Sequence, residues 1–380
     1  MDKNTIYGLI LMALIFLGFM WLSPKPEQTT DTSGPETEQT ADAAASTRPD
    51  ALSANELEWL RNNIAANGDA SVAEDGKRVY THRDAAMDLT LAGDSLYGTV
   101  NVGGRAYPLA DILAADPSIP VADQRKAIET VRATSTSMGR YGKFSRFLTG
   151  NDASVTLQND VIALRLDSKS GSVTRAELKK YDTEYSADES KNVKNKVVIF
   201  DGPSNSFNFT LPLAQAVETR NLYFRPEQVN DSTVRMLLDM GQDAYWGLEY
   251  TLPRGESYLL GVKVVQRNMD RIVETNNRIL GFDWQQQIKR QEKGRMFEER
   301  NSGIYYKFAG GSVETLSESK NDSEERQAKV KWIGFKNQFF SSVMIADRNF
   351  NSVDFDSRII KNSDYLKDVS ARATVNDYSW

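Results

Sequence analysis

The chain has 380 residues, of which 26% are charged and 40% hydrophobic, and its formal net charge at pH 7 is −6. It holds no cysteine and one histidine, which excludes thiolate nucleophiles, disulfides, cysteine-bound zinc and paired-histidine metal motifs. Eleven acids against three bases make residues 23–75 strongly acidic, so residues 76–380 are left slightly positive, at about +2. Because the basic footprint of a nucleic-acid binder is absent from the sequence, we expect no nucleic-acid partner.

The first hydrophobic stretch, Ile6–Leu22, runs for seventeen residues without a charge. It reaches the lower end of the roughly 17–25 residues that span a bilayer. Tyr7 and Trp21 lie near its ends, where aromatic rings favour the lipid–water boundary. A cleaved signal peptide would have a shorter apolar core and small residues directly after it. We therefore predict an uncleaved membrane anchor over residues 1–23, and the lysine distribution favours a cytoplasmic N-terminus.

Residues 24–52 are rich in Pro, Thr, Glu, Ala and Ser, and this composition predicts a disordered acidic linker. Ser53 and Glu56 then form a capping box, which predicts a helix that ends at Asn67-Gly68. We interpret this helix as packing on a neighbouring element, although an interfacial helix using Trp59 is the alternative.

Residues 77–109 show short alternating strands, with Gly103-Gly104 as a two-residue hairpin turn. Helical patterns follow over residues 110–115 and 121–133. The single histidine, His82, stands among polar residues, and we expect it at the surface rather than in catalysis. Residues 53–148 are therefore predicted to form a small α+β extension.

Residues 149–380 change to strand after strand, with apolar residues at every second position and turn residues about every ten positions. This pattern predicts a large antiparallel β-sandwich with aromatic core residues. We expect its abundant Asp and Glu residues on the solvated face. Asp364–Ala371 fits one further helix. The alternating segments are Ile162/Leu164/Leu166, Phe207/Phe209/Leu211, Trp246/Leu248/Tyr250/Leu252, Tyr258/Leu260/Val262/Val264 and Ile304/Tyr306/Phe308.

Four stretches of this region resemble the large periplasmic domain of the YidC membrane protein insertase family of Gram-negative bacteria. They are Thr156–Tyr181, Tyr250–Tyr258, Lys331–Ala346 and the segment Asp377-Tyr378-Ser379-Trp380. The third is the most specific, because Trp332, Gln338, Phe339 and Phe340 match the family's Trp-Ile/Val-x-x-x-x-Gln-Tyr/Phe-Phe segment. The last is similar to the element before the family's second transmembrane helix, where Trp380 would suit an aromatic belt.

The resemblance implies a β-supersandwich, related in shape to mutarotase-like folds. It also implies a non-enzymatic role in the insertion, folding and assembly of inner-membrane proteins. The expected partners are nascent inner-membrane proteins, the secretion translocon with its accessory subunits, and the lipid bilayer through residues 6–22. Residues 24–380 would be periplasmic. The family's membrane-embedded core does not appear in these 380 residues, so we expect the anchor and periplasmic part of an insertase.

Two questions stay open at this stage. The segment with Trp332, Gln338, Phe339 and Phe340 could dock a partner, but we favour the interpretation that both phenylalanines are core residues. The alternative function is a membrane-tethered carbohydrate-binding or scaffold module on the same sandwich. Catalysis is disfavoured because proton transfer on such folds usually uses a histidine with a carboxylate, and we expect neither cofactor nor metal.

Overall fold

The computed structural model describes residues 51–380, with the exception of residues 186–194, 203 and 274. The predicted anchor and nearly all of the predicted linker lie outside the described residues. In the part of the chain that is described, no helix is long and apolar enough to cross a membrane.

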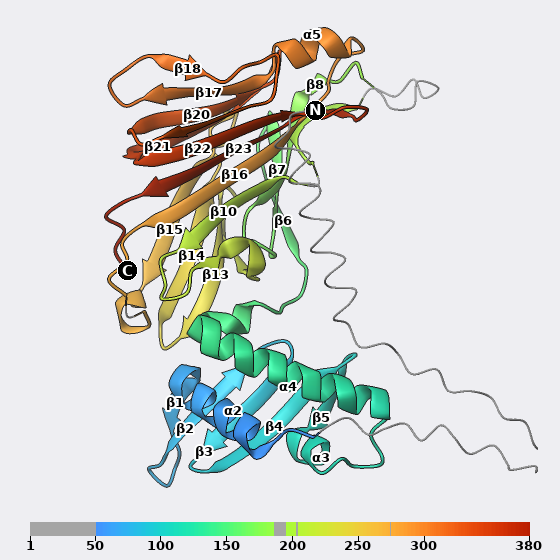
Figure 1. Ribbon diagram of the computed structural model, residues 1–380, viewed down its shortest axis with the longest axis vertical. Coiled ribbons are helices and arrows are strands. Elements are labelled where there is room, and N and C mark those ends of the chain that lie inside the picture. Colours follow the sequence, from blue (N-terminus) through green and yellow to red (C-terminus); the bar gives the residue numbers. More distant parts are fainter. Residues whose placement is uncertain (1–50, 186–194, 203, 274) are drawn as a thin grey trace, which may run out of the picture. The chain divides into compact units, whose positions relative to one another are not determined.

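The first described part is a five-stranded antiparallel sheet whose strands follow one another in chain order. Helices α2 and α4 cross one face of this sheet (Figure 1) and enclose a hydrophobic cluster of their own. The strands are β1 (Asp69–Val72), β2 (Arg78–Arg83), β3 (Met87–Ala92), β4 (Ser95–Val102) and β5 (Arg105–Pro108). The helices are α2 (Ala54–Asn67), α3 (Leu109–Leu113), α4 (Val121–Tyr141) and the short 3-10 helix η1 (Gly142–Phe147).

Local signals explain these elements. The Ser53–Glu56 capping box is present, and α2 ends at Asn67, as predicted. The Gly103-Gly104 hairpin is also confirmed: Val102 pairs with Arg105, and both glycines adopt positive φ angles that this turn requires. Helix α4 continues to Tyr141, eight residues beyond its predicted end, because buried polar side chains and Met138 extend its covered face.

The surface position predicted for His82 is wrong. Its side chain is 1% exposed, because the alternation of β2 turns it toward the helix-covered face beside Leu89. The His82 Nε2 lies 3.1 Å from the Asp84 Oδ2. The other carboxylate oxygen of Asp84 accepts the backbone N–H groups of Ala86 and Met87. Asp84 is therefore buried together with His82, and its side chain is 2% exposed.

The second part consists of four antiparallel sheets around one hydrophobic cluster, so the described chain is mainly β, as predicted. The sheet orders are β6-β7-β8-β9, β11-β10-β16-β23-β22-β19, β12-β13-β14-β15 and β18-β17-β20-β21. The strands are β6 (Ser154–Gln158), β7 (Ile162–Asp167), β8 (Val173–Asp182), β9 (Lys196–Phe200), β10 (Ser206–Leu211), β11 (Val217–Glu218), β12 (Arg225–Asn230), β13 (Thr233–Gly241), β14 (Ala244–Thr251), β15 (Gly261–Arg267), β16 (Leu280–Lys289), β17 (Gly303–Phe308), β18 (Val313–Thr315), β19 (Asp322–Arg326), β20 (Val330–Lys336), β21 (Ser341–Phe350), β22 (Ser352–Ile359) and β23 (Tyr365–Val375). Short helices occur at η2 (Thr219–Asn221), η3 (Met269–Arg271) and α5 (Arg295–Arg300).

Strands β7, β10, β14 and β17 fall where the alternating segments predicted them. The helix predicted over Asp364–Ala371 is wrong, since these residues belong almost entirely to β23. This strand lies between β16 and β22 and pairs with both, and Val369, Ala371 and Ala373 are buried at every second position. Tertiary pairing thus overrides a weak local helical pattern.

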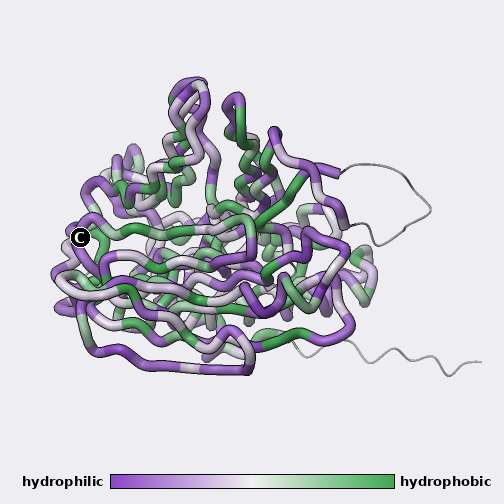
Figure 2. Tube along the Cα trace, turned by 90° about the horizontal axis from the view of Figure 1, so that it is seen from above, coloured by the Kyte–Doolittle hydropathy of each residue, from purple (hydrophilic) through white to green (hydrophobic). Residues whose placement is uncertain are grey.

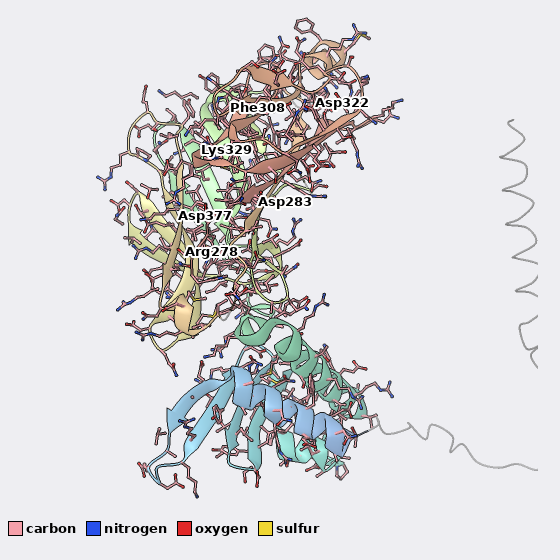
Figure 3. All side chains as sticks on the ribbon, turned by 60° about the vertical axis from the view of Figure 1, so that its left-hand side comes forward. Arg278, Asp283, Phe308, Asp322, Lys329 and Asp377 are labelled. Atoms are coloured by element: carbon pink, nitrogen blue, oxygen red, sulfur yellow. The ribbon has the colours of Figure 1, made fainter. Side chains whose placement is uncertain are left out.

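The six-stranded sheet carries a cluster of ion pairs. Asp283 of β16 binds Arg372 on the neighbouring strand at 3.2 Å and Arg220 of η2 at 3.1 Å, and it is labelled among the side chains of Figure 3. Hydrophilic connections lie at the periphery and hydrophobic segments run between them in the end-on view of Figure 2. The core therefore lies between the sheets, as the alternating pattern requires.

Candidate docking groove

A groove with a volume of about 530 Å³ opens in the β-rich part of the chain. Its lining comes from strands of all four sheets and from the connections before β15 and β21. Strand β15 is the outer strand of one sheet and β21 the outer strand of another. The groove therefore lies beside two strands that, among the described residues, each have one neighbour in their sheet.

The floor of the groove is buried and apolar. Ile162 and Leu164 of β7, Leu178 of β8, Tyr250 of β14 and Trp284 of β16 all line it and are at most 6% exposed. These residues sit at alternate positions of their strands, so the period-two pattern that builds the core also builds this floor. The cavity volume is in the range of 300–1,000 Å³ typical of ligand pockets.

The rim is unusual because it exposes large hydrophobic side chains. Leu259 is 68% exposed, Ile345 is 58% exposed and Phe339 is 54% exposed. Tyr181 and Tyr258 are also exposed on the rim. Exposed apolar side chains are ordinary when they are scattered singly, but their concentration on one concave surface is typical of an interaction site.

The lining carries no formal charge: none of its residues is Asp, Glu, Lys or Arg. The Lys180 ammonium, next to Tyr181 in sequence, pairs with the Glu256 carboxylate, which raises the pKa of Lys180. Partial desolvation, followed by the neighbouring Tyr181 hydroxyl, raises the pKa of Tyr258. Tyr258 therefore stays neutral at physiological pH, and burial of a charged occupant in this uncharged groove would be costly.

One polar side chain on the floor has an unused acceptor. Gln286 of β16 is 4% exposed, and its Nε2 donates to the backbone carbonyl of Ile199 at 2.7 Å. Its Oε1 has no hydrogen-bond partner among the described residues. A buried amide oxygen without a partner is costly. Because the Oε1 is itself buried, an occupant of the groove could donate to it only after the Gln286 side chain turns.

The structure separates the four residues of the sequence-predicted segment. Phe339 and Phe340 line the groove, and the Phe340 ring packs edge-on against Tyr181 with 5.4 Å between ring centroids. The prediction that both phenylalanines are core residues is wrong for Phe339, and Phe340 is half-buried. Trp332 and Gln338 are also half-buried but do not line the groove.

Sequence reasoning missed the other side of the rim. The alternating pattern predicts a strand that includes Tyr258 and Leu259, but β15 begins only at Gly261. The signal available is the adjacent apolar pair Leu259-Leu260, because a half-buried strand alternates rather than placing large apolar residues side by side. Their approach to Tyr181 depends on tertiary structure that no local pattern encodes.

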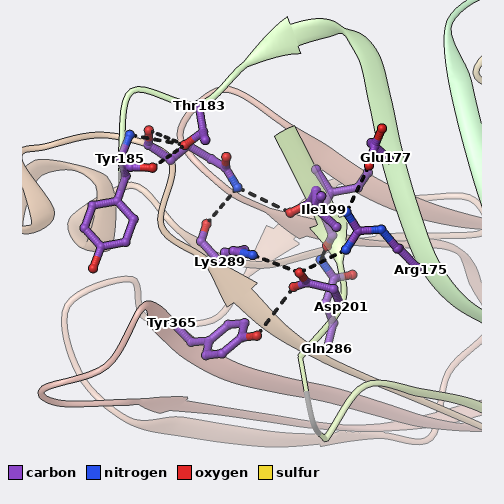
Figure 4. A network of polar contacts seen from close by, with 11 residues as sticks. Arg175, Glu177, Thr183, Tyr185, Ile199, Asp201, Gln286, Lys289 and Tyr365 are labelled. Atoms are coloured by element: carbon purple, nitrogen blue, oxygen red, sulfur yellow. Dashed lines mark hydrogen bonds and ion pairs between the residues drawn. The ribbon is translucent and has the colours of Figure 1, made fainter. Parts of the chain in front are cut away.

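A second pocket, of about 430 Å³, is polar and lies near the ends of β8, β9 and β16. Around it, Asp201 accepts a bond from Lys289 at 2.8 Å, lies 3.6 Å from Arg175 and receives the Tyr365 hydroxyl at 3.5 Å (Figure 4). Arg175 also binds Glu177 at 2.9 Å. Burial, and then Asp201, raise the pKa of Tyr365. Because these charges bind one another across strands, we interpret the network as structural.

Comparison with known proteins places this groove in a family. A family model described as the YidC periplasmic domain matches residues 154–377, which is more than half of the chain. The chain belongs to the YidC periplasmic domain family. Every residue that lines the groove lies in the range matched by the YidC periplasmic domain, whereas the first five-stranded sheet lies outside it.

Relatives of this YidC periplasmic domain chain carry the name "Membrane protein insertase YidC". The protein from Parabacteroides distasonis is 37% identical over 250 residues, which is 65% of this chain and 38% of that protein. A protein from Bacteroides fragilis is 34% identical over 374 residues, covering 98% of this chain and 47% of its own length. This chain thus spans less than half the length of these relatives.

Two solved structures are also similar to the chain. A galactose mutarotase related enzyme from Lactobacillus acidophilus has a TM-score of 0.37 at 12% identity, covering 60% of this chain and 87% of that one. A galactose mutarotase-like protein from Lactobacillus casei has a TM-score of 0.34 at 10% identity, covering 58% of this chain and 87% of that one.

Proposed function

We propose that this chain is the periplasmic part of a membrane protein insertase that assists the insertion, folding and assembly of inner-membrane proteins. The observation that carries the proposal is the uncharged groove, whose rim exposes Leu259, Phe339 and Ile345 to water. A membrane protein outside the bilayer exposes apolar segments that water solvates poorly. A groove of this character covers such a segment until it enters the membrane.

The proposal includes place and partners. The chain acts at the inner membrane, with Ile6–Leu22 as its anchor and the described part in the periplasm, alone or beside the secretion translocon. Family membership and the names of the relatives support this. The role is one of binding rather than catalysis, and it uses neither cofactor nor metal ion.

The groove favours this function over carbohydrate binding. Sugar recognition needs many directed polar groups, yet the lining offers Gln286, two serines and the tyrosine hydroxyls among mostly aliphatic and phenyl groups. A glycan array that gave reproducible binding by the full chain would restore the carbohydrate-binding alternative.

Chemical cross-linking tests the proposed function without reference to any one surface. Inner-membrane vesicles with the full chain receive ribosome-bound nascent chains of a two-span inner-membrane protein, and a short amine-reactive reagent is added. Nascent chains of a water-soluble exported protein are the matched control. We expect at least fivefold more adduct with the membrane protein, because only its nascent chain exposes membrane-spanning apolar segments that need to be covered. Equal adduct yields from the two nascent chains would contradict the proposal.

Co-purification tests the proposed association of the chain with the secretion translocon. We expect secretion translocon subunits to be retained on the affinity-tagged full chain, and the variant carrying Phe339→Asp and Phe340→Asp to retain less. Unchanged retention by that variant, with an unchanged thermal melting temperature, would count against direct docking through these residues.

A further inference from the structure

We infer that the groove binds an extended, uncharged apolar segment of another polypeptide, which adds as a strand to the free edge of β21. The inference deepens the proposed function by naming how a nascent membrane protein would be held, and it rests on that function for the identity of the partner. Two observations carry it: the free edge of β21 and the absence of charge in the groove lining.

The backbone of β21 has hydrogen-bonding groups to offer. The N–H of Asn337 donates to the carbonyl of Phe340, and the same register pairs Gly334 with Val343 further along the ladder. Because hydrogen-bonded and non-bonded pairs alternate in antiparallel ladders, the N–H and C=O of Val343 point away from β20. The described residues place no further strand on that side. An added strand satisfies these groups by β-augmentation.

The dimensions suit a short peptide. Residues 341–345 of β21 all line the groove. At about 3.3 Å per residue, five residues of strand extend over roughly 16 Å. Val343 and Ile345 project to one side of the strand and are 51% and 58% exposed, so alternate side chains of the occupant meet an apolar surface.

Charge and polarity distinguish a polypeptide from an acyl chain. The uncharged lining complements an uncharged segment and makes the burial of a Lys or Asp side chain costly. An acyl chain would match the apolar walls, but it cannot pair with the edge of β21. A peptide backbone supplies both donors and acceptors.

The experiment uses the full chain in lipid nanodiscs and the neutral peptide acetyl-Thr-Val-photoleucine-Val-Thr-amide as its probe. After irradiation, the attachment sites are mapped by mass spectrometry, and empty nanodiscs give the background. We expect adducts on residues 341–345 and 258–260. The matched peptide with N-methyl groups on both valines and on the photoleucine keeps the apolar side chains but is blocked on both of its edges. It cannot form the ladder, so we expect at least tenfold less adduct. A peptide with Lys in place of one valine is also expected to label poorly.

Two variants test the edge directly. Val343→Pro removes the outward N–H, and proline is tolerated on an edge strand when its N–H side faces solvent. Val313→Pro is the control, because Val313 lies in β18, at the opposite edge of the same sheet, and is 51% exposed. We expect Val343→Pro to reduce labelling at least threefold and Val313→Pro to leave it unchanged.

The outcomes separate the inference from the function on which it rests. Equal labelling by the N-methylated peptide would overturn strand addition, since the groove would then act only as an apolar surface, as for an acyl chain. Labelling at β18, between two copies of the chain or on residues 1–50 would also overturn the proposed site. If nascent membrane proteins cross-link to the chain while the peptide fails to label the groove, the proposed function survives and this inference fails. If the peptide labels the groove while nascent chains give no adducts, strand addition survives and the proposed function fails.

Discussion

The indole N–H of Trp246 donates a hydrogen bond to the hydroxyl of Tyr378 across 2.9 Å. Trp246 is fully buried in β14, whereas Tyr378 follows β23 in a different sheet. The same hydroxyl donates to the Oε1 of Gln266 on β15 at 2.6 Å. Trp380 packs edge-on against Tyr378, with 5.2 Å between ring centroids. Tyr378 thus ties the segment after β23 to the sheet that contains β14 and β15.

Replacement of Tyr378 by Phe removes the acceptor of a buried indole N–H. An unpaired buried donor costs about 1–3 kcal/mol, so we expect Tyr378→Phe to lower the free energy of unfolding by that amount in urea denaturation. Tyr97→Phe is the control, because Tyr97 is 53% exposed and surface changes usually stay within about 0.5 kcal/mol. If the two variants lose the same stability, the hydrogen bond has no net effect.

The stability that Tyr378 contributes depends on pH. Burial raises the pKa of Tyr378 from 10.0 to about 12. Between these values the folded protein keeps a proton that the unfolded chain releases, so stability falls as the pH rises through this window. Tyr378→Phe lacks this titrating hydroxyl. The difference in the free energy of unfolding between wild type and variant should therefore narrow from pH 9 to pH 11.5. Urea denaturation at both pH values measures the gap. A constant gap would show that the hydroxyl titrates normally in the folded protein.

Two phenylalanines near the groove should respond differently to truncation. Phe335 is 1% exposed and stacks on Trp284 with 3.9 Å between ring centroids, so Phe335→Ala should cost about 3–5 kcal/mol. Phe339 is 54% exposed on the rim, and we expect Phe339→Ala to cost less than about 1 kcal/mol. Chemical denaturation measures both losses. A large loss in the free energy of unfolding for Phe339→Ala would show that the Phe339 side chain is packed in the core.

The contrast between these two residues shows how far sequence reasoning reaches. Period-two alternation locates strands β7, β10 and β14 and the buried side chains they carry, because one face of a sheet must be apolar. It cannot separate Phe339 from Phe335, since both are aromatic residues in an apolar context. Phe335 is covered by Trp284 of β16, which is distant in sequence, whereas Phe339 stays 54% exposed.

The incorrect sequence predictions also arise from structure that a local pattern does not report. The polar sequence neighbours of His82 predict a surface position, but alternation puts only Thr81 and Arg83 on the opposite face of β2 and leaves His82 beside Asp84. The helix predicted at residues 364–371 is wrong because pairing with β16 and β22 decides that segment. The groove requires four sheets to be placed together, and a single sequence does not report their arrangement.

Lys367 allows a test of how burial changes the pKa of a lysine and, through it, the stability of the fold. Its side chain is fully buried in β23, and its ammonium donates to the backbone carbonyls of Ser302 and Glu318. Desolvation lowers the pKa of Lys367, against the attraction of the nearby Glu318 and Glu299 carboxylates. Between the lowered value and the ordinary 10.5, the unfolded chain binds more protons than the folded one, so wild-type stability gains as the pH rises through that window.

Lys367→Met lacks the titrating ammonium and therefore its pH-dependent contribution to stability. We therefore expect the stability of wild type relative to Lys367→Met to increase between pH 8 and pH 10, as measured by urea denaturation. The comparison of two chains that share all other titrating groups cancels their contributions. Lys263→Met, at an exposed position of β15, is the control and should show no such trend. A difference that stays constant with pH would mean that Lys367 keeps its ordinary pKa in the folded state.

The first five-stranded sheet should respond to a glycine that cannot accept a side chain. Gly98 of β4 has a φ of +137°, and an added Cβ would overlap the carbonyl oxygen of Asp88 on β3. Gly76 also has a positive φ, +79°, but an added Cβ meets nothing within 4 Å. We expect Gly76→Ala to cost about 1–2 kcal/mol of backbone strain and Gly98→Ala clearly more.

Because this sheet has its own hydrophobic cluster, hydrogen exchange in Gly98→Ala should accelerate over residues 78–108 and stay unchanged over residues 280–289. Equal acceleration in both ranges would show that the two clusters unfold as one unit.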